Sequence, residues 1–147
     1  MKIIAKNKRA SYDYSLKEKY EAGITLSGTE VKSLRQGKAT IGESYISIDR
    51  NDEIWAYNIN IPQYEFGNIH NHEETRKRKL LLHKKEIEIL KHQIKAGGMT
   101  IVPTILYFKR SLVKLEIALG KGKKLHDKRD DQAKKDVQRK IQRGIYD

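Results

Sequence analysis

The sequence contains no cysteine, so disulfide bonds and thiolate-bound zinc are excluded. It has no apolar run near the roughly 20 residues that cross a bilayer. Residues 1–6 are too short and too charged for a secretory signal. Neither an amphipathic aromatic anchor nor a lipidation signal is present. We therefore expect a cytoplasmic protein without membrane contact.

Acidic residues are also scarce compared with basic ones. The chain has 31 Lys and Arg against 19 Asp and Glu, which gives a formal net charge of +12 and a pI of about 9.8. This excess favours a polyanionic partner, because each cation placed near a phosphate releases a condensed counterion. An anionic membrane is the rival polyanion, but the anchor that it would require is missing. A nucleic acid is the favoured partner.

Length and charge distribution predict one folded body followed by a basic tail. The 147 residues suit a single domain with its own core. The apolar pattern ends after Gly120, and residues 120–147 carry seven Lys and three Arg against five Asp. We therefore divide the chain into a body of residues 1–119 and a C-terminal tail of residues 120–147. We expect the tail to be disordered when free.

The tail nevertheless has a helical pattern. Val137, Ile141 and Ile145 recur at a spacing of four residues, which would place them on one face of a basic amphipathic helix. We expect this helix to form only when a partner supports it.

Alternation of apolar and polar residues predicts that the body is mainly β. It is clearest at residues 112–119, where Val113, Leu115, Ile117 and Leu119 form one face. Further strands are predicted around residues 12–16, 20–26, 45–48, 54–59 and 100–108. Roughly six short strands suggest a small antiparallel barrel, closed or partly open, of the oligonucleotide-binding (OB) type.

Two short helices should lie at the periphery of this α+β fold. Residues 27–37 form one, because Ser27 or Thr29 can cap its start and Gly37 can end it in a left-handed conformation. Residues 84–95 form the other, with Ile87, Leu90 and Ile94 on one stripe.

No pattern supports an enzyme. His70 and His72 resemble part of a nuclease motif, but Glu73 and Glu74 are adjacent and face different ways on most backbones. A polar solvated loop explains these residues better than a metal site. Residues 120–124 (GKGKK) fail the spacing of a phosphate-binding loop. We expect no catalytic residues, no metal and no cofactor.

Basic clusters and tyrosines favour RNA. The clusters are residues 6–9, 76–79 and 121–129, and three tyrosines, Tyr12, Tyr14 and Tyr20, follow the first. A tyrosine ring can stack on an unpaired base. Packing inside the sheet is the more frequent role for any one of them, and a charge run is often only a solvated loop. Both interpretations remain open for these clusters.

Several motifs occur in order along the chain. They are residues 7–10 (NKRA), 20–24 (YEAGI), 28–38 (GTEVKSLRQGK), 76–82 (RKRKLLL), 120–124 (GKGKK) and 127–129 (DKR). Together they resemble the small protein B family, the bacterial SsrA-binding proteins. Because the motifs span nearly the whole chain, the resemblance is far more specific than any one of them.

The resemblance implies an OB-type body with peripheral helices and a binding function. Such proteins bind the tRNA-like part of transfer-messenger RNA near its elbow and replace the missing anticodon arm. Their tail enters the decoding centre and the empty mRNA channel of a stalled ribosome and becomes helical there. Trans-translation then tags the nascent peptide for degradation and rescues the ribosome. The family has no catalytic activity, and we expect a monomer that binds RNA one to one.

The resemblance also assigns site residues. Glu21 would act as a hydrogen-bond acceptor, although a salt bridge to Lys19 or Lys8 is the simpler interpretation. The predicted RNA-binding residues are Lys8, Arg9, Tyr14, Glu21, Lys32, Arg35, Arg76, Arg78 and Lys79. The predicted decoding-centre residues are Lys121, Lys123, Lys124, His126, Asp127, Lys128 and Arg129, with His126 stacked on a ribosomal base and the lysines near small-subunit rRNA phosphates. The alternative is a general ribosomal or single-stranded RNA-binding protein.

Overall fold

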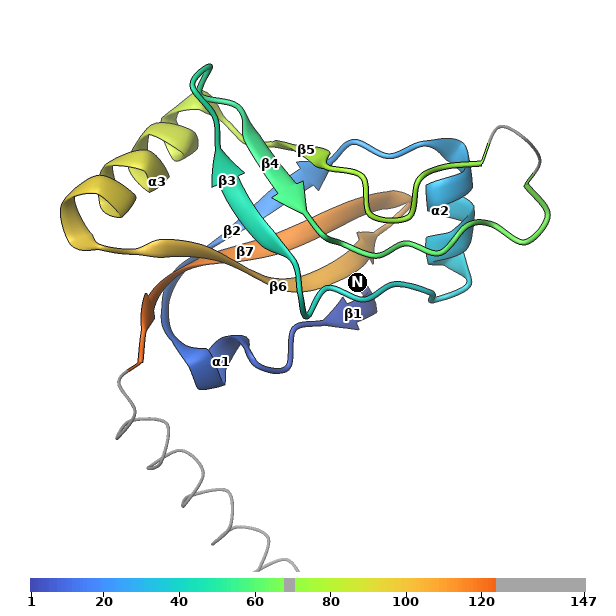
Figure 1. Ribbon diagram of the computed structural model, residues 1–147, viewed down its shortest axis with the longest axis horizontal. Helices are drawn as coiled ribbons and strands as arrows, with labels where there is room; N and C mark the ends of the chain where they lie inside the picture. Colours follow the sequence, from blue (N-terminus) through green and yellow to red (C-terminus); the bar gives the residue numbers. More distant parts are fainter. Residues whose placement is uncertain (68–70, 124–147) are drawn as a thin grey trace, which may run out of the picture.

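The computed structural model of the protein describes residues 1–67 and 71–123 (Figure 1). Seven strands and three helices lie within these ranges. The strands are β1 (Lys2–Lys6), β2 (Tyr14–Ile24), β3 (Tyr45–Ile48), β4 (Ile54–Tyr57), β5 (Arg78–Leu81), β6 (Thr100–Lys109) and β7 (Leu112–Gly122). The helices are α1 (Ala10–Asp13), α2 (Gly28–Arg35) and α3 (Lys84–Gly97).

The strands form one antiparallel sheet in the order β1-β6-β7-β2-β5-β4-β3. The sheet curls so that β3 packs against β6, but within the described ranges no ladder joins these two strands. The predicted β-dominated α+β fold is therefore confirmed, and the barrel is an open one. Helices α2 and α3 lie at opposite ends of the long axis, and the chain leaves β7 at the end away from α2 (Figure 1).

Alternation along β7 fills the core. Val113, Leu115, Ile117 and Leu119 are all buried, and Leu112 on the opposite face is 62% exposed. Burying each such side chain contributes about 1.5–3 kcal/mol. The predicted strand is thus confirmed, and its apolar face packs against residues of β2, β4, β5 and β6 in one cluster.

One strand was not predicted, and the start of another was predicted wrongly. Residues 2–6, which show no clean alternation, form strand β1 because they pair with the outer edge of β6. The alternation beginning at Tyr12 is interrupted by α1, so β2 starts at Tyr14. Both differences arise from pairing across the sheet, which local periodicity does not report.

Strand β7 extends past residue 119, where we divided the body from the tail. Strand β7 continues to Gly122, pairing with Tyr14, and the Lys123 N–H donates to the Asp13 carbonyl at 3.0 Å. Gly120 has no room for a side chain, since a Cβ there would lie 2.8 Å from Val102 Cγ2. Residues 120–122 are therefore part of the sheet, and close packing requires glycine at position 120.

Helix α2 is held by a capping box at its first turn and by a buried ion pair. Ser27 and Glu30 form a capping box, in which each side chain bonds the other's backbone N–H. Glu30 also accepts from Arg76 and from Arg78 Nε. Glu30 and Arg78 are both fully buried. Arg78 further donates to the Ile59 carbonyl at 2.6 Å and the Glu74 carbonyl at 3.0 Å.

This geometry corrects one predicted site residue. Arg78 was expected on the RNA-binding surface, but its side chain is 0% exposed. Its guanidinium is already occupied by a carboxylate and backbone carbonyls, which is how a buried cation is tolerated. Arg78 therefore joins β5 to α2 and to the segments around residues 59 and 74, and it does not reach a ligand.

Replacing Glu30 with Gln should destabilise the fold by about 3–5 kcal/mol, because it leaves Arg78 as a buried charge without a counterion. Urea unfolding at neutral pH measures this loss. The matched control is Glu65→Gln at an exposed loop position, which should change stability by less than about 0.5 kcal/mol. A loss for Glu30→Gln as small as that of the control would contradict the structural role.

The same carboxylate should make stability depend on acid pH. Burial raises the pKa of Glu30, but hydrogen bonds from Arg76, the Ser27 N–H and Arg78 outweigh this and leave the pKa below its ordinary 4.5. The pair therefore stabilises the fold above about pH 4.5, and the contribution is lost as pH falls through the folded-state pKa. The stability difference between wild type and Glu30→Gln should shrink between neutral pH and pH about 3. A difference independent of pH would refute this assignment.

Candidate nucleic-acid interface

Two surface hollows contain three of the predicted RNA-binding residues of the body, Arg9, Tyr14 and Glu21. The first, which we call the tyrosine hollow, has a volume of about 500 Å³ and lies between α1 and the starts of β2, β3 and β6. Tyr14 and Tyr45 both line it. The hollow therefore brings together two aromatic side chains 31 positions apart in the sequence.

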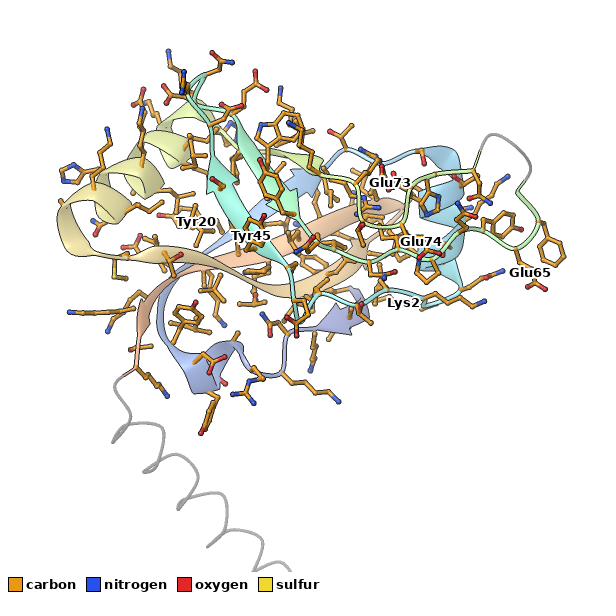
Figure 2. All side chains as sticks on the ribbon, in the orientation of Figure 1. Lys2, Tyr20, Tyr45, Glu65, Glu73 and Glu74 are labelled. Carbon is orange, nitrogen blue, oxygen red and sulfur yellow. The ribbon has the colours of Figure 1, made fainter. Side chains whose placement is uncertain are left out.

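Tyr45 is the better placed of these rings to stack on a base. It is 52% exposed and lies on β3 (Figure 2). One ring face packs on Tyr57, with centroids 4.9 Å apart and planes at 8°. Tyr57 therefore fixes the orientation of the ring while Tyr45 stays accessible, which is the geometry of a stacking platform.

One cation and one amide line the same hollow, together with the carboxylates of Asp13 and Glu43. Arg9 lines it, lies 5.0 Å from the centroid of the Tyr12 ring, and approaches Asp13 at 3.4 Å. The Arg9 side chain is 71% exposed, so these contacts orient it without burying its charge. Asn7 donates to the Pro103 carbonyl at 2.9 Å and thereby ties the chain before α1 to β6. Lys8 between them is exposed.

The second hollow, which we call the Glu21 cleft, has a volume of about 390 Å³. It lies along β2, β5 and β7, and Leu81, a large apolar side chain in its lining, is 55% exposed. Its lining residues are Glu21, Gly23, Leu81, Leu82, His83, Glu86 and Lys114. An acceptor, a cation and an apolar surface together suit a nucleotide, with its base edge, phosphate and sugar.

The Glu21 carboxylate is held by two donors from β6. The Tyr107 hydroxyl donates to Oε2 at 2.6 Å, and Lys109 Nζ lies 3.2 Å from Oε1. The bond from Tyr107, followed by that from Lys109, lowers the pKa of Glu21. Burial and the bond to Glu21 raise the pKa of Tyr107, which keeps its hydroxyl a donor. Glu21 is thus an oriented, ionised acceptor, and its partners are neither Lys19 nor Lys8.

The other predicted body residues are dispersed. Lys32 is exposed on α2 with its ammonium 5.6 Å from the Tyr64 ring centroid, and Arg35 is exposed at the end of the same helix. Arg76 bonds to Glu30, and Lys79 pairs with Glu53 at 3.3 Å. Arg76 and Lys79 therefore interact with the protein's own carboxylates, whereas Lys32 and Arg35 face solvent.

Among the predicted decoding-centre residues, only Lys121 and Lys123 fall within the described ranges. Lys121 is exposed on β7, and Lys123 follows the last residue of that strand. Lys124, His126, Asp127, Lys128 and Arg129 lie outside the described residues.

Sequence reasoning missed Tyr45, Leu81, His83 and Lys114. The alternation of residues 80–82 predicts that Leu81 points away from the buried Leu80, which is a signal for an exposed apolar residue. Nothing in the neighbouring sequence distinguishes Tyr45 from an ordinary aromatic residue of a strand. Its significance arises only from its neighbours in the hollow.

The histidine pair has a structural role where it is described. His72 is buried, with Nδ1 2.8 Å from Thr29 Oγ1 and Nε2 2.7 Å from the Ile61 carbonyl. Among residues 1–67 and 71–123, no group of three His, Asp or Glu side chains is arranged to hold a metal. His70 lies outside the described residues. No helix within those ranges is long and apolar enough to span a membrane.

An open β-sheet with oriented tyrosines, exposed cations and a nucleotide-sized cleft defines a small basic protein of the RNA-binding class. The chain belongs to the SmpB protein family, whose model matches residues 4–147. This confirms the resemblance drawn from the motifs.

The relatives match over nearly their full length. The SsrA-binding protein of Thermosipho africanus is 54% identical over 142 residues, which are 96% of this chain and 95% of that protein. That of Saccharopolyspora erythraea is 52% identical over 144 residues, 98% of this chain and 90% of the relative. A solved structure described as tmRNA-SmpB and the center of the bacterial ribosome shares 44% identity, with a TM-score of 0.66 over 82% of this chain and 84% of that one.

Tyr107 should act on Glu21 without itself contacting a ligand. Replacing Tyr107 with Phe should raise the pKa of the Glu21 carboxyl, since the lost hydrogen bond is the largest factor that lowers it. A carboxyl-detected NMR titration measures the shift. Tyr57→Phe is the control, because it also removes a tyrosine hydroxyl, but from a ring that stacks on Tyr45 and not from the donor to Glu21. It should leave the Glu21 titration unchanged. An unchanged Glu21 titration in Tyr107→Phe would contradict the assignment.

Proposed function

We propose that the protein binds the tRNA-like domain of transfer-messenger RNA, also called SsrA, and delivers it to stalled ribosomes. It replaces the anticodon arm that this RNA lacks. Its tail lies in the decoding centre and the empty mRNA channel. Trans-translation can then tag the nascent peptide for degradation and rescue the ribosome.

The observation that carries this proposal is the full-length similarity to SsrA-binding proteins, at about half of all positions. The solved structure with a similar chain is described as tmRNA-SmpB and the center of the bacterial ribosome. A general RNA-binding protein would also be basic, but it would not need to match SsrA-binding proteins in sequence along both the body and the tail. The family match extends to residue 147 and so includes the tail.

The body supplies a surface for a shaped RNA. Tyr14 and Tyr45 offer rings for unstacked bases of a loop, and Arg9 and Lys8 lie beside them for phosphates. In the Glu21 cleft, the oriented carboxylate accepts a hydrogen bond from an amino or imino N–H of a base. A backbone phosphate has no such donor, so this contact would read a base. Lys114 lines the same cleft and neutralises the flanking backbone.

The tail supplies the second contact. Strand β7 ends beside α1, and the chain continues from there into the tail (Figure 1). Ribosomal RNA phosphates would be met by the basic residues of the tail, namely Lys121, Lys123, Lys124, Lys128 and Arg129. His126 would stack on a base, and Asp127 stands between His126 and Lys128 in the sequence. The role of the protein is binding alone, without catalysis, and its place of action is the cytoplasm, where ribosomes work.

Two substitutions in the full chain separate these surfaces. Lys114→Gln should weaken binding to transfer-messenger RNA and reduce the slope of log affinity against log salt by about one, because one phosphate contact is lost. His126→Ala should leave that affinity unchanged within about twofold. It should reduce peptide tagging on stalled ribosomes roughly tenfold, since stacking on a base is worth about 1–3 kcal/mol.

The control is Lys85→Gln, an exposed substitution on α3, which should change neither measurement. An excess of ordinary tRNA should compete poorly with transfer-messenger RNA for binding to the wild-type protein. If tRNA and unrelated RNAs compete equally, and both substitutions weaken all of them alike, the protein is a general RNA binder and the proposal is wrong.

A further inference from the structure

A third hollow lies at the α2 end of the molecule, and neither the tyrosine hollow nor the Glu21 cleft includes it. Its volume is about 450 Å³. We call it the basic hollow, because three of its lining side chains are cations and none is acidic. Its lining residues are Met1, Lys2, Arg35, Phe108, Arg110 and Ser111.

Three separate elements bring the cations together. Lys2 begins β1 and pairs with Phe108 of β6, which places it beside the β6–β7 turn. Arg110 lies in that turn with a φ of 60°, a left-handed conformation unusual for a residue with a side chain. Arg35 is the last residue of α2 and lines the same hollow as Lys2, which Figure 2 labels. The buried Glu30–Arg78 pair fixes the helix that carries Arg35.

Unlike several other cations of the described body, those of this hollow form no ion pair with the protein's own carboxylates. Arg9, Arg76, Lys79, Lys91 and Lys109 all pair with a carboxylate of the protein. Within residues 1–67 and 71–123, Lys2, Arg35 and Arg110 make no such ion pair. Like charges around one hollow repel one another, and an anion placed between them removes this cost.

The lining also suits the oxygens of a phosphate. Arg35 and Arg110 each carry a fork of N–H donors, and Ser111 contributes an exposed hydroxyl at the rim. Phe108 is 8% exposed and closes one wall without competing for the anion. We propose that the basic hollow binds a backbone phosphate of RNA, mainly through Arg35 and Arg110, with Lys2 adding charge.

This contact is separate from those proposed for the rest of the body. Strand β7 starts at the turn beside the hollow and ends at Gly122, which pairs with Tyr14 of the tyrosine hollow. Its 11 residues span about 35 Å at about 3.3 Å each. A phosphate in the basic hollow therefore belongs to a different RNA segment from a base on Tyr14 or Tyr45. The inference rests on the proposed function only in taking RNA as the partner.

The test measures binding of full-length variants to two RNAs over a range of salt concentrations. The probes are the tRNA-like domain of transfer-messenger RNA and isolated small ribosomal subunits. Arg35→Gln and Arg110→Gln should each weaken binding to one of these RNAs by about tenfold, since a charge-assisted contact contributes about 1.5–3 kcal/mol. The salt slope should fall by about one. The RNA that loses affinity identifies the source of the phosphate.

A double substitution sharpens the result. If Arg35 and Arg110 hold one phosphate, their joint loss should be smaller than the sum of the single losses. Ser111→Asp adds a negative charge at the rim without removing a cation, and it should weaken the same RNA. It also keeps the test valid if an arginine variant unfolds, which urea unfolding will reveal.

The matched control is Arg50→Gln, an exposed arginine after β3 that lines none of the three hollows. It should have less than about a twofold effect on either RNA. The proposal is overturned if the hollow variants bind both RNAs as Arg50→Gln does. Strictly additive losses at Arg35 and Arg110 would also overturn it, because the two arginines would then not share one phosphate. Failure of wild type to prefer transfer-messenger RNA would instead refute the proposed function.

Discussion

The buried ion pair between Glu30 and Arg78 is the interaction on which the arrangement of this protein depends. One guanidinium bonds a carboxylate of α2 and the backbone carbonyls of residues 59 and 74. It thereby joins the helix, the end of the β4 segment and the loop before β5. Every buried side-chain nitrogen or oxygen in the described ranges has a partner, as a buried charge of this kind requires. Glu30 meets this requirement through its cap as well as through both arginines.

The pair also changes the meaning of the most conspicuous basic run in the sequence. Of residues 76–79, Arg76 and Arg78 bond Glu30, Lys77 lies 4.5 Å from the Trp55 ring centroid, and Lys79 pairs with Glu53. Much of this charge is neutralised inside the protein. The cations available to a polyanion are single residues spread over several elements. They include Lys8, Arg9, Lys32, Arg35, Arg110 and Lys114.

Much of the fold could be predicted from local patterns, because strand alternation and helix capping are local properties. The buried face of β7 and both ends of α2 are examples. Strand β1 and the burial of Arg78 could not be predicted, since each depends on a partner far along the chain. Glu30 is 48 positions from Arg78, and nothing near either residue marks the other.

The candidate site shows the same division. The family motifs pointed to Tyr14 and Glu21, and the structure places each of them in a surface hollow. Tyr45, Leu81 and Lys114 could be found only after folding, because different strands bring them beside those residues. The roles of all these side chains on RNA remain predictions.

NMR of the isotope-labelled full chain, titrated with the tRNA-like domain of transfer-messenger RNA, tests the central claim most directly. The claim is that RNA binds at the hollows while the Glu30–Arg78 pair remains internal. The largest backbone amide shifts should occur near Tyr14, Glu21, Tyr45 and Lys114, with the Arg78 Nε–H signal still protected from solvent exchange. Loss of that protection on binding, with little change around Glu21 and Tyr45, would contradict the account.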